Sequence, residues 1–279
     1  MIEKPEQYEA VPEENELFGS ADQVALMRRA KSSWTLVRDD PSYSFYGRMF
    51  SLCNPGIDAP DRVGALARLQ GATSCQYYPA AQASRLSAAL DARGIRTSRY
   101  EQCWGGEDAV AASRRLLDQH SLPDDLTVVT VDADTPPAQV ADLAQLSLDC
   151  EVMPVDGSPM RGLSRRGVCL LATDLDGKAV ATASSYLSNH PSSPHATDAF
   201  WGMLATRQDR RGERIGLLLG ARAIVSMWET HGARAFTTGV EKDNSASMPL
   251  RSRLGVIVSD WVFIGCIDPG TFAGSSITK

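Results

Sequence analysis

The chain has 279 residues, 43% of them hydrophobic, and carries a formal net charge of −6 with an isoelectric point near 5.3. This acidic balance argues against a nucleic acid or an anionic membrane as partner, since both attract a basic protein, and it suits a cationic amine. No run of eighteen apolar residues would span a membrane, and the N-terminus lacks a charged-then-apolar leader, so we expect a cytoplasmic protein. The length indicates two structural units.

The cysteines favour neither a metal site nor a disulfide framework. They are widely spaced and include no CxxC pair, which a structural zinc site would require. They occupy positions 53, 75, 103, 150, 169 and 266. We therefore predict that the protein holds no metal.

Residues 1–125 give the weaker signals. An acidic, proline-bearing segment comes first, and glycine then ends the clearest helix pattern. The expected elements are a helix at 21–30, a strand at 42–53, a helix at 80–94, a strand at 95–104 and a helix at 108–120. These indicate an α/β unit.

The order of elements is clearer from residue 126. β-branched runs bounded by turn residues predict strands, and Asp176–Gly177 is a hairpin signal between two of them. A proline starts an amphipathic helix pattern between the first two strands. The expected elements are strands at 126–131, 168–175, 178–188 and 199–206, with a helix at 137–150.

The most informative stretch is LATRQDRRGERIG, residues 204–216, where a strand enters a basic turn and a helix follows at once. The first backbone N–H groups of a helix lack internal partners and lie at the positive end of its dipole. Four arginines add charge there, at 207, 210, 211 and 214. This arrangement predicts a site for a pyrophosphate. The helix is expected from Glu213 to His231, where the dipole would favour a cationic histidine.

The absence of two common nucleotide-binding motifs narrows the choice of cofactor. Neither GxxxxGK[ST] nor GxGxxG is present. The string RRGERIG resembles the coenzyme A loop of the GCN5-related N-acetyltransferases, [QR]-x-x-G-x-[GA]. Arg211 matches its first position and Gly216 its last, whereas Arg214 stands where the family has a glycine. Gly212 supplies flexibility two residues earlier.

A second motif lies downstream of a predicted strand at 233–240. The family commonly shows N-x-x-A-x-x-L-Y-x-x-x-G-F, and four positions here fall on or near that pattern: Asn244, Ser247, Leu250 and Gly255. Arg251 replaces the tyrosine and Val256 the phenylalanine. Residues 256–268 would supply the closing pair of strands. Two motifs in the right order are more specific than either alone.

The resemblance covers residues 126–268 and implies an α+β fold with a mixed, mostly antiparallel sheet flanked by helices. We expect domains at 1–125 and 126–279. The first is either a degenerate first copy in a tandem arrangement or an unrelated cap. Dimers are common for this fold, so a homodimer is a further expectation.

The resemblance also implies a cofactor, acetyl-CoA, and its contacts. Backbone groups of Leu204 and Thr206 would pair with the pantetheine arm, which Asn244 would also contact. The pyrophosphate would lie on the turn formed by Arg211, Gly212, Arg214 and Gly216.

The acid and the base are less defined. Arg251 cannot donate a proton near neutral pH, since the pKa of arginine is about 12.5 or higher. Ser252 or Tyr186 could replace the tyrosine, or the thiolate could leave unassisted. Glu241 and Asp198, both at strand ends, are the candidate bases.

Two functional hypotheses follow. The first is an acyl-CoA-dependent N-acetyltransferase acting on the primary amine of a small molecule, or secondarily of a protein or peptide terminus. The second is a catalytically silent coenzyme A-binding or protein-interaction module with the same fold, which the changes at Arg214 and Arg251 favour. A nucleotide-binding regulator that uses the same basic helix start is a third reading.

Overall fold

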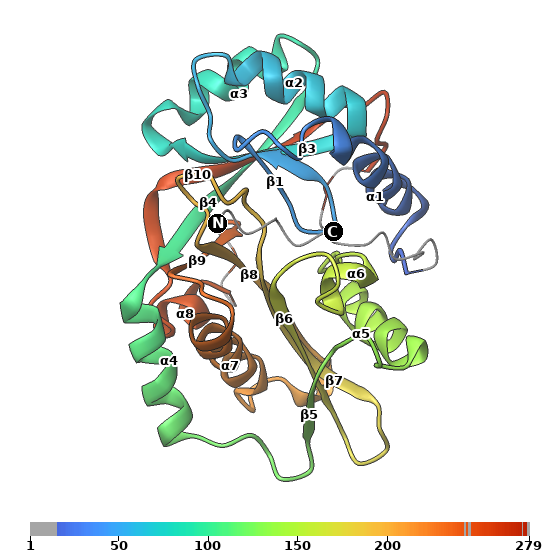
Figure 1. The fold of residues 1–279 in the computed structure, drawn as a ribbon, viewed down its shortest axis with the longest axis vertical. Helices are drawn as coiled ribbons and strands as arrows, with labels where there is room; N and C mark the ends of the chain where they lie inside the picture. The colour runs from blue at the N-terminus through green and yellow to red at the C-terminus, as the bar shows by residue number, and fades with distance from the viewer. Residues whose placement is uncertain (1–15, 243, 245–246, 275, 278–279) are drawn as a thin grey trace, which may run out of the picture.

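One ten-stranded sheet runs through the whole molecule, in the order β1-β2-β3-β10-β4-β9-β8-β7-β6-β5 (Figure 1). The computed structural model describes residues 16–242, 244, 247–274 and 276–277. Neighbouring strands are antiparallel except for two parallel pairs, β2 with β3 and β8 with β9. The mixed, mostly antiparallel sheet flanked by helices confirms the predicted fold class.

The described part of the first half, from residue 16, contributes four strands and four α-helices. Helix α1 has a complete capping box, in which the Ser20 hydroxyl and the Gln23 side chain satisfy each other's backbone N–H groups. The elements are α1 (Ala21–Ser33), β1 (Tyr43–Phe45), β2 (Phe50–Leu52), α2 (Ala59–Gln70), β3 (Ala72–Pro79), α3 (Ala83–Asp91), β4 (Arg96–Gly105) and α4 (Glu107–Gln119), with short 3-10 turns at Trp34–Leu36 and Ala80–Gln82.

The second half contributes six strands and four α-helices among the described residues. They are β5 (Thr127–Thr130), α5 (Pro137–Asp149), α6 (Gly157–Met160), β6 (Gly167–Thr173), β7 (Ala179–Leu187), β8 (Asp198–Thr206), α7 (Ile215–Thr230), β9 (Ala235–Val240), α8 (Ser247–Arg253) and β10 (Ile257–Ile267), with a 3-10 turn at Gln208–Arg210. The predicted boundary at residue 125 falls in the connection between α4 and β5, and it stays a prediction.

Helices α5 and α7 cover opposite faces of this half of the sheet. Successive residues of a strand point to opposite faces, and in β6 Leu170 packs with the α7 side whereas Leu171 packs with the α5 side. Both faces are therefore buried, which explains the continuous apolar run of β6. Helix α7 is apolar on nearly every side, because α4 packs against it as well.

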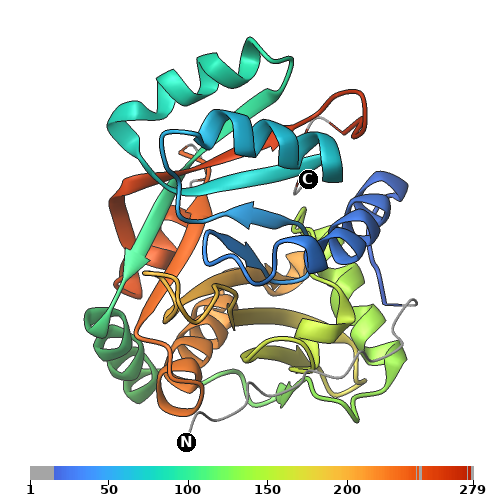
Figure 2. The same cartoon turned by 45° about the horizontal axis from the view of Figure 1, so that its top comes forward.

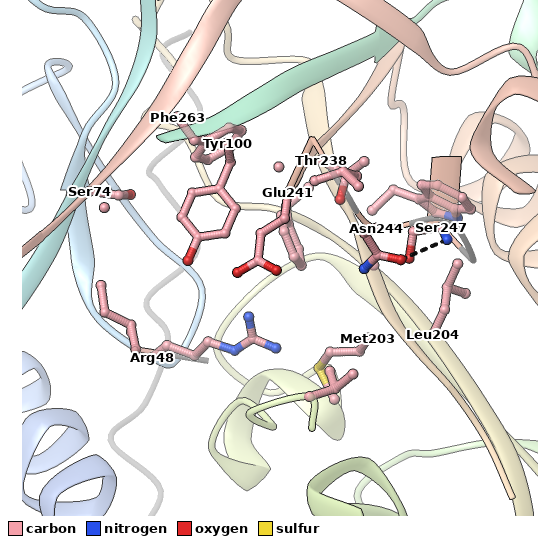
Figure 3. Close-up of a pocket in the computed structure, with 18 of the residues that line it drawn as sticks. Arg48, Ser74, Tyr100, Met203, Leu204, Thr238, Glu241, Asn244, Ser247 and Phe263 are labelled. Atoms are coloured by element: carbon pink, nitrogen blue, oxygen red, sulfur yellow. Dashed lines mark hydrogen bonds between the residues drawn. The ribbon is translucent and has the colours of Figure 1, made fainter. Parts of the chain in front are cut away.

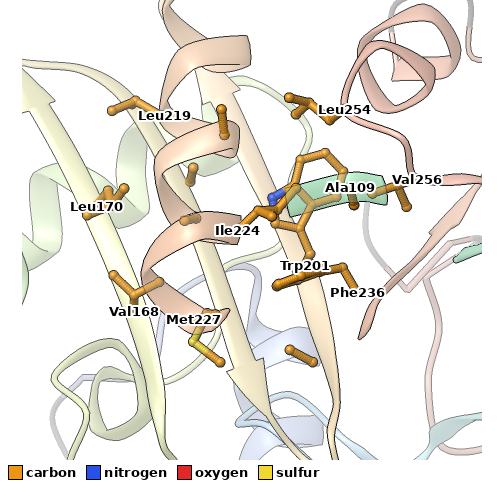
Figure 4. Close-up of a cluster of buried hydrophobic side chains, with 14 of the residues drawn as sticks. Ala109, Val168, Leu170, Trp201, Leu219, Ile224, Met227, Phe236, Leu254 and Val256 are labelled. Atoms are coloured by element: carbon orange, nitrogen blue, oxygen red, sulfur yellow. The ribbon is translucent and has the colours of Figure 1, made fainter. Parts of the chain in front are cut away.

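A close approach fixes α7 on β8. The indole Nε1 of Trp201 donates a hydrogen bond to the Gly220 carbonyl at 3.1 Å, and a Cβ at Gly220 would come within 2.9 Å of the Trp201 ring (Figure 4). Glycine is therefore required at this point of the helix. Because α7 cannot slide along β8, its first turn has a fixed position relative to the end of that strand.

The two halves exchange their last strands. Each half has a parallel strand pair joined by a helix, followed by a second helix and a strand. Strand β10 pairs with β3 of the first half, and β4 of the first half pairs with β9 (Figure 2). The long antiparallel pair of β4 with β10 joins the halves into one sheet.

The predicted closing pair of strands is wrong. Residues 257–267 form a single strand, and the place between β9 and β10 is filled by β4 from the first half. Residues 257–267 contain no two-residue turn sequence that would close a hairpin. The predicted strand at 42–53 is likewise two short strands, β1 and β2, separated by a turn.

Candidate functional site

Strands β8 and β9 separate partway along their length. They pair only from Asp198 with Ala235 to Phe200 with Thr237, although β8 continues to Thr206 and β9 to Val240. A cavity of about 250 Å³ opens between the separated ends, lined by residues 200–204 and 238–241 and by Asn244 and α8 (Figure 3). A sheet that opens in this way exposes backbone edges to a ligand that runs between the strands.

A β-bulge disturbs β8 at the cavity wall. Gly202 pairs with Ser184 and Ala205 with Thr182, so one extra residue stands on the β8 side. Met203 has a left-handed φ of 51°, and it and Leu204 take no partner in the β7 register. A bulge reorients the groups of its strand, which leaves the backbone around Leu204 suited to a ligand contact.

Two residues of the turn before α7 have left-handed backbone conformations. Gly212 has a φ of 91°, and Arg214, which is the N-cap residue, has a φ of 62°. A left-handed N-cap explains why the family has glycine at the position of Arg214. The arginine adopts the same conformation, at a strain of about 1 kcal/mol. The departure from the motif therefore places an arginine in a backbone conformation that favours glycine.

The four arginines of the turn divide into two pairs. Arg207 bonds to Asp174 and Asp209, and Arg210 bonds to Asp125 and Glu213, so their charges are balanced. These arginines hold the pKa values of Asp174, Asp209 and Glu213 below the ordinary range. These ion pairs connect the turn to neighbouring segments at Asp174 and Asp125.

Arg211 and Arg214 are the pair whose charge is not balanced. Within the described part of the chain, neither lies within ion-pair distance of a carboxylate. The Nε atom of Arg211 donates to the Thr206 carbonyl at 3.2 Å, and its Nη2 atom lies 3.8 Å from the Cys150 sulfur. Together with the first N–H groups of α7, these two guanidinium groups suit a pyrophosphate.

Gly216 lies in the first turn of α7, beside the end of β8. A Cβ there would come within 3.0 Å of the Thr206 hydroxyl. A larger side chain at this position would therefore require the Thr206 side chain to move.

The corresponding helix of the first half has the opposite charge at its start. Helix α2 follows its parallel strand as α7 follows β8, but its N-cap is Asp58 and its first turn contains Asp61. Carboxylates at a helix N-terminus satisfy the dipole themselves and repel a phosphate. The start of α2 therefore has acidic residues where the turn before α7 has arginines.

Asn244 begins α8. Its side-chain oxygen accepts a hydrogen bond from the Ser247 backbone N–H at 2.9 Å (Figure 3). Asn244 also lines the cavity, so the residue singled out by the motif both bonds to the first residue of α8 and faces the cavity.

The candidate acid and base residues lie in different environments. Glu241 follows β9 and directs its carboxylate into the cavity (Figure 3). Ser252 is exposed, donates to the Met248 carbonyl at 3.0 Å, and does not line the cavity. Tyr186 is fully buried, and burial raises the pKa of its hydroxyl. Of the candidate acids and bases, Glu241 is the one placed against the cavity.

Asp198 lies at the other end of β8, away from the cavity. Its Oδ2 atom accepts from the Tyr77 hydroxyl at 3.2 Å and the Trp104 Nε1 at 3.3 Å, and it lies 3.2 Å from the His195 Nδ1. His195 stacks on the Tyr77 ring, with centroids 3.5 Å apart. These contacts connect the two halves of the sheet.

Arg251 lines the cavity at the position of the family's tyrosine. It is 3% exposed; its Nη1 atom donates to the Val256 carbonyl at 3.1 Å, and its Nη2 lies 2.8 Å from the Met248 sulfur. No carboxylate of a described residue pairs with it. A fixed positive charge therefore lies at the position where the family's motif has a tyrosine.

The first half supplies part of the cavity wall that the sequence motifs did not indicate. Tyr46 and Arg48 come from the turn between β1 and β2, Ser74 from β3 and Tyr100 from β4. These segments have no motif of their own and reach the cavity because β4 and β10 join the halves. No cluster that could hold a metal ion, and no helix long and apolar enough to cross a membrane, occurs among the described residues.

Solved structures of other proteins have a similar arrangement. The sequence matches no protein-family model and no curated protein. A GCN5-related N-acetyltransferase from Kribbella flavida aligns with 88% of this chain and 96% of its own, at 17% identity and a TM-score of 0.55. A Drosophila protein aligns with 88% of this chain and 89% of its own, at 13% identity and a TM-score of 0.50.

A tandem protein of the same acetyltransferase group, from the clavulanic acid biosynthesis pathway, covers 78% of this chain and 68% of its own, at 18% identity and a TM-score of 0.48. The separated strands, the glycine-bearing turn and the alignment over almost the whole Kribbella protein agree with one another. The chain has the fold of the GCN5-related N-acetyltransferases.

Proposed function

We propose that this protein transfers an acetyl group from acetyl-CoA to the primary amine of a small molecule. The observation that carries the proposal is the alignment of two features along β8. The strand separates from β9 beyond Phe200, and six residues later it leads into the turn that contains Arg211 and Arg214. An elongated ligand with a phosphate at one end fits both the opening between the strands and the turn.

The donor's binding residues follow from that alignment. The turn of Arg211, Gly212, Arg214 and Gly216 would hold the pyrophosphate, and the backbone of Leu204 and Thr206, with Asn244, would hold the pantetheine arm. Bound there, acetyl-CoA supplies an acyl group activated as a thioester. The backbone N–H groups beside the bulge at Met203 are the donors that we assign to the acyl oxygen.

The proton and the leaving sulfur need separate residues. Glu241 directs its carboxylate into the cavity, and we assign to it removal of the proton that the attacking ammonium must lose. An arginine is not a proton donor, so the contribution that we assign to the buried Arg251 is charge, which stabilises the negative sulfur as it leaves. Ser252, turned to the Met248 carbonyl, needs no role in this scheme.

The size of the acceptor follows from the wall that the first half provides. Tyr46, Arg48 and Tyr100 border the cavity opposite the donor strands, and the whole cavity, its donor end included, has a volume of about 250 Å³. A cavity enclosed by both halves favours a small amine over a protein terminus. The predicted homodimer and the cytoplasmic location stay predictions.

Calorimetric titration with acetyl-CoA, with ATP and NAD as controls, tests the binding part of the proposal. We expect binding of acetyl-CoA alone; binding of ATP or NAD instead would favour a nucleotide-binding regulator. Turnover of acetyl-CoA with a panel of small amines tests the catalytic part. Binding without turnover of any amine would favour the silent module, which the arginine at position 251 also allows.

A further inference from the structure

Arg48 is a buried cation that has no ion-pair partner among the described residues. It lies in the turn between β1 and β2 and is 5% exposed. Its Nε and Nη2 atoms are buried with no hydrogen-bond partner, and no carboxylate of a described residue lies within ion-pair distance. Burial of an unpaired guanidinium is unfavourable, since water is lost and nothing replaces it. The side chain directs this group into the cavity (Figure 3).

The surrounding residues hold Arg48 in place without neutralising it. Its guanidinium carbon lies 5.7 Å from the Tyr46 ring centre and 5.9 Å from that of Phe200, and these two rings stack 4.4 Å apart. The backbone is also fixed, because the Asp156 N–H donates to the Gly47 carbonyl at 3.0 Å. Aromatic rings orient a guanidinium but leave its N–H donors for another acceptor.

Arg48 is too far from the phosphate-binding turn to serve the same group. It packs against Phe200, whereas the turn follows Thr206, six residues further along β8. At about 3.3 Å per residue, this separates the two cationic sites by about 20 Å. The charge of Arg48 therefore stands at the acceptor end of the cavity, which the carboxylate of Glu241 also faces.

We propose that Arg48 binds the carboxylate of the acceptor, so that the substrate class is a small amine that also carries a carboxylate, such as an amino acid. This inference rests on the proposed function. The planar guanidinium matches a carboxylate with two parallel hydrogen bonds. In this pose the acceptor carboxylate lies on Arg48 and its amino group lies toward Glu241. The negatively charged end is held away from the donor's phosphates.

The test compares acceptors that differ only in the carboxylate: an amino acid, its amide and its decarboxylated amine. Both α-amino and ω-amino acids are included, because either could bridge Arg48 and Glu241. In one of the two series, α-amino or ω-amino, we expect the wild-type kcat/KM for the acid to exceed that for its amide and its amine by about 100-fold. Arg48→Gln should remove that preference and leave rates with the amide and amine within about threefold. Arg85→Gln, which neutralises an exposed arginine on α3, is the matched control.

A thermal unfolding series provides a readout that does not need turnover. Without ligand, Arg48→Gln should melt at or above the wild-type temperature, because the variant lacks a buried unpaired charge. Millimolar amino acid should raise the melting temperature of the wild type and of Arg85→Gln but not of Arg48→Gln. Preference for the amide or amine, or a destabilised Arg48→Gln with unchanged acceptor preference, would overturn the inference. Acetyl-CoA binding is measured on the same samples; its failure would refute the proposed function separately.

Discussion

The hydroxyl of Tyr77 donates a hydrogen bond to the carboxylate of Asp198 at 3.2 Å, across 121 residues of sequence. Tyr77 belongs to β3 of the first half and Asp198 begins β8 of the second. Burial and the neighbouring carboxylate raise the pKa of Tyr77 far above its ordinary value, so the hydroxyl remains a donor. The pair connects the two halves at the end of β8 that lies away from the cavity.

Asp198→Ala should therefore reduce stability. The substitution leaves the Tyr77 hydroxyl and the Trp104 Nε1 without their acceptor, which costs about 2–4 kcal/mol. Urea unfolding measures this. Asp198→Asn keeps an acceptor oxygen and should lose less, with turnover of the folded protein near wild type. Loss of turnover in Asp198→Asn with unchanged unfolding would instead make Asp198 the base.

Changes at the turn that we propose as the pyrophosphate site should weaken acetyl-CoA binding. Arg211→Ala removes an unbalanced charge and should raise the dissociation constant about tenfold. Gly216→Glu adds a clash at the Thr206 hydroxyl and a negative charge at the helix start, and should raise it by about 100-fold or more. Calorimetry checks both, with Arg85→Ala as the control. Unchanged affinity in both variants would mean that the donor binds elsewhere.

Acetyl-CoA should protect one cysteine from alkylation. Cys150 is partly exposed, and its thiol donates to the Thr206 carbonyl at 3.4 Å, beside Arg211. The other five cysteines are buried, and burial raises the pKa of Cys53 to about 12, which keeps that thiol unreactive. Mass spectrometry after iodoacetamide treatment should show slower labelling of Cys150 when acetyl-CoA is present. Equal labelling with and without the ligand would argue against this position for the donor.

Glu241→Gln should separate catalysis from binding. The amide cannot accept the proton of the attacking ammonium, so kcat/KM should fall by about 10²–10⁴ while the affinity for acetyl-CoA stays within about twofold. Steady-state kinetics over a pH series and calorimetry measure the two effects. Ser252→Ala should change neither, since that hydroxyl donates to the Met248 carbonyl outside the cavity. Wild-type kinetics for Glu241→Gln at every pH would exclude Glu241 as the base.

His231 should make stability depend on pH. The helix dipole predicted a favoured cation here, but partial burial, and then the charge of Arg166, lower the pKa of His231 below 6.5. The unfolded chain therefore binds the proton more tightly, so the contribution of His231 is complete above pH 6.5 and is lost as the pH falls below it.

The stability of the wild type relative to His231→Gln should accordingly decrease between pH 7.5 and pH 5.5, as measured by urea unfolding. The Arg166→Gln variant keeps His231 but lacks the repelling charge, so its stability should decrease less over this pH range than that of the wild type. A decrease of the same size in His231→Gln as in the wild type would show that another group is responsible.

The sequence alone determined the features that depend on neighbouring residues. The helix expected at 213–231 is found at Ile215–Thr230, because its apolar pattern, its basic start and the glycine that ends it all lie within one stretch of chain. Asn244 was likewise identifiable, since a helix cap and its helix are adjacent. Helix α2 and strand β3 were missed, although Val63, Leu66 and Ala67 have helical spacing.

Only the tertiary structure decided which strands meet and which side chains share the cavity. Strand β4 lies between β9 and β10 because its edges pair there, and a strand's own residues do not specify a partner more than 130 positions away. Arg48 reaches the cavity because the turn between β1 and β2 is bonded to the second half at Asp156, and it has no motif around it. Local patterns specify backbone conformation and charge, whereas the pairing of distant strands and the burial that isolates a charge depend on the packing of the whole chain.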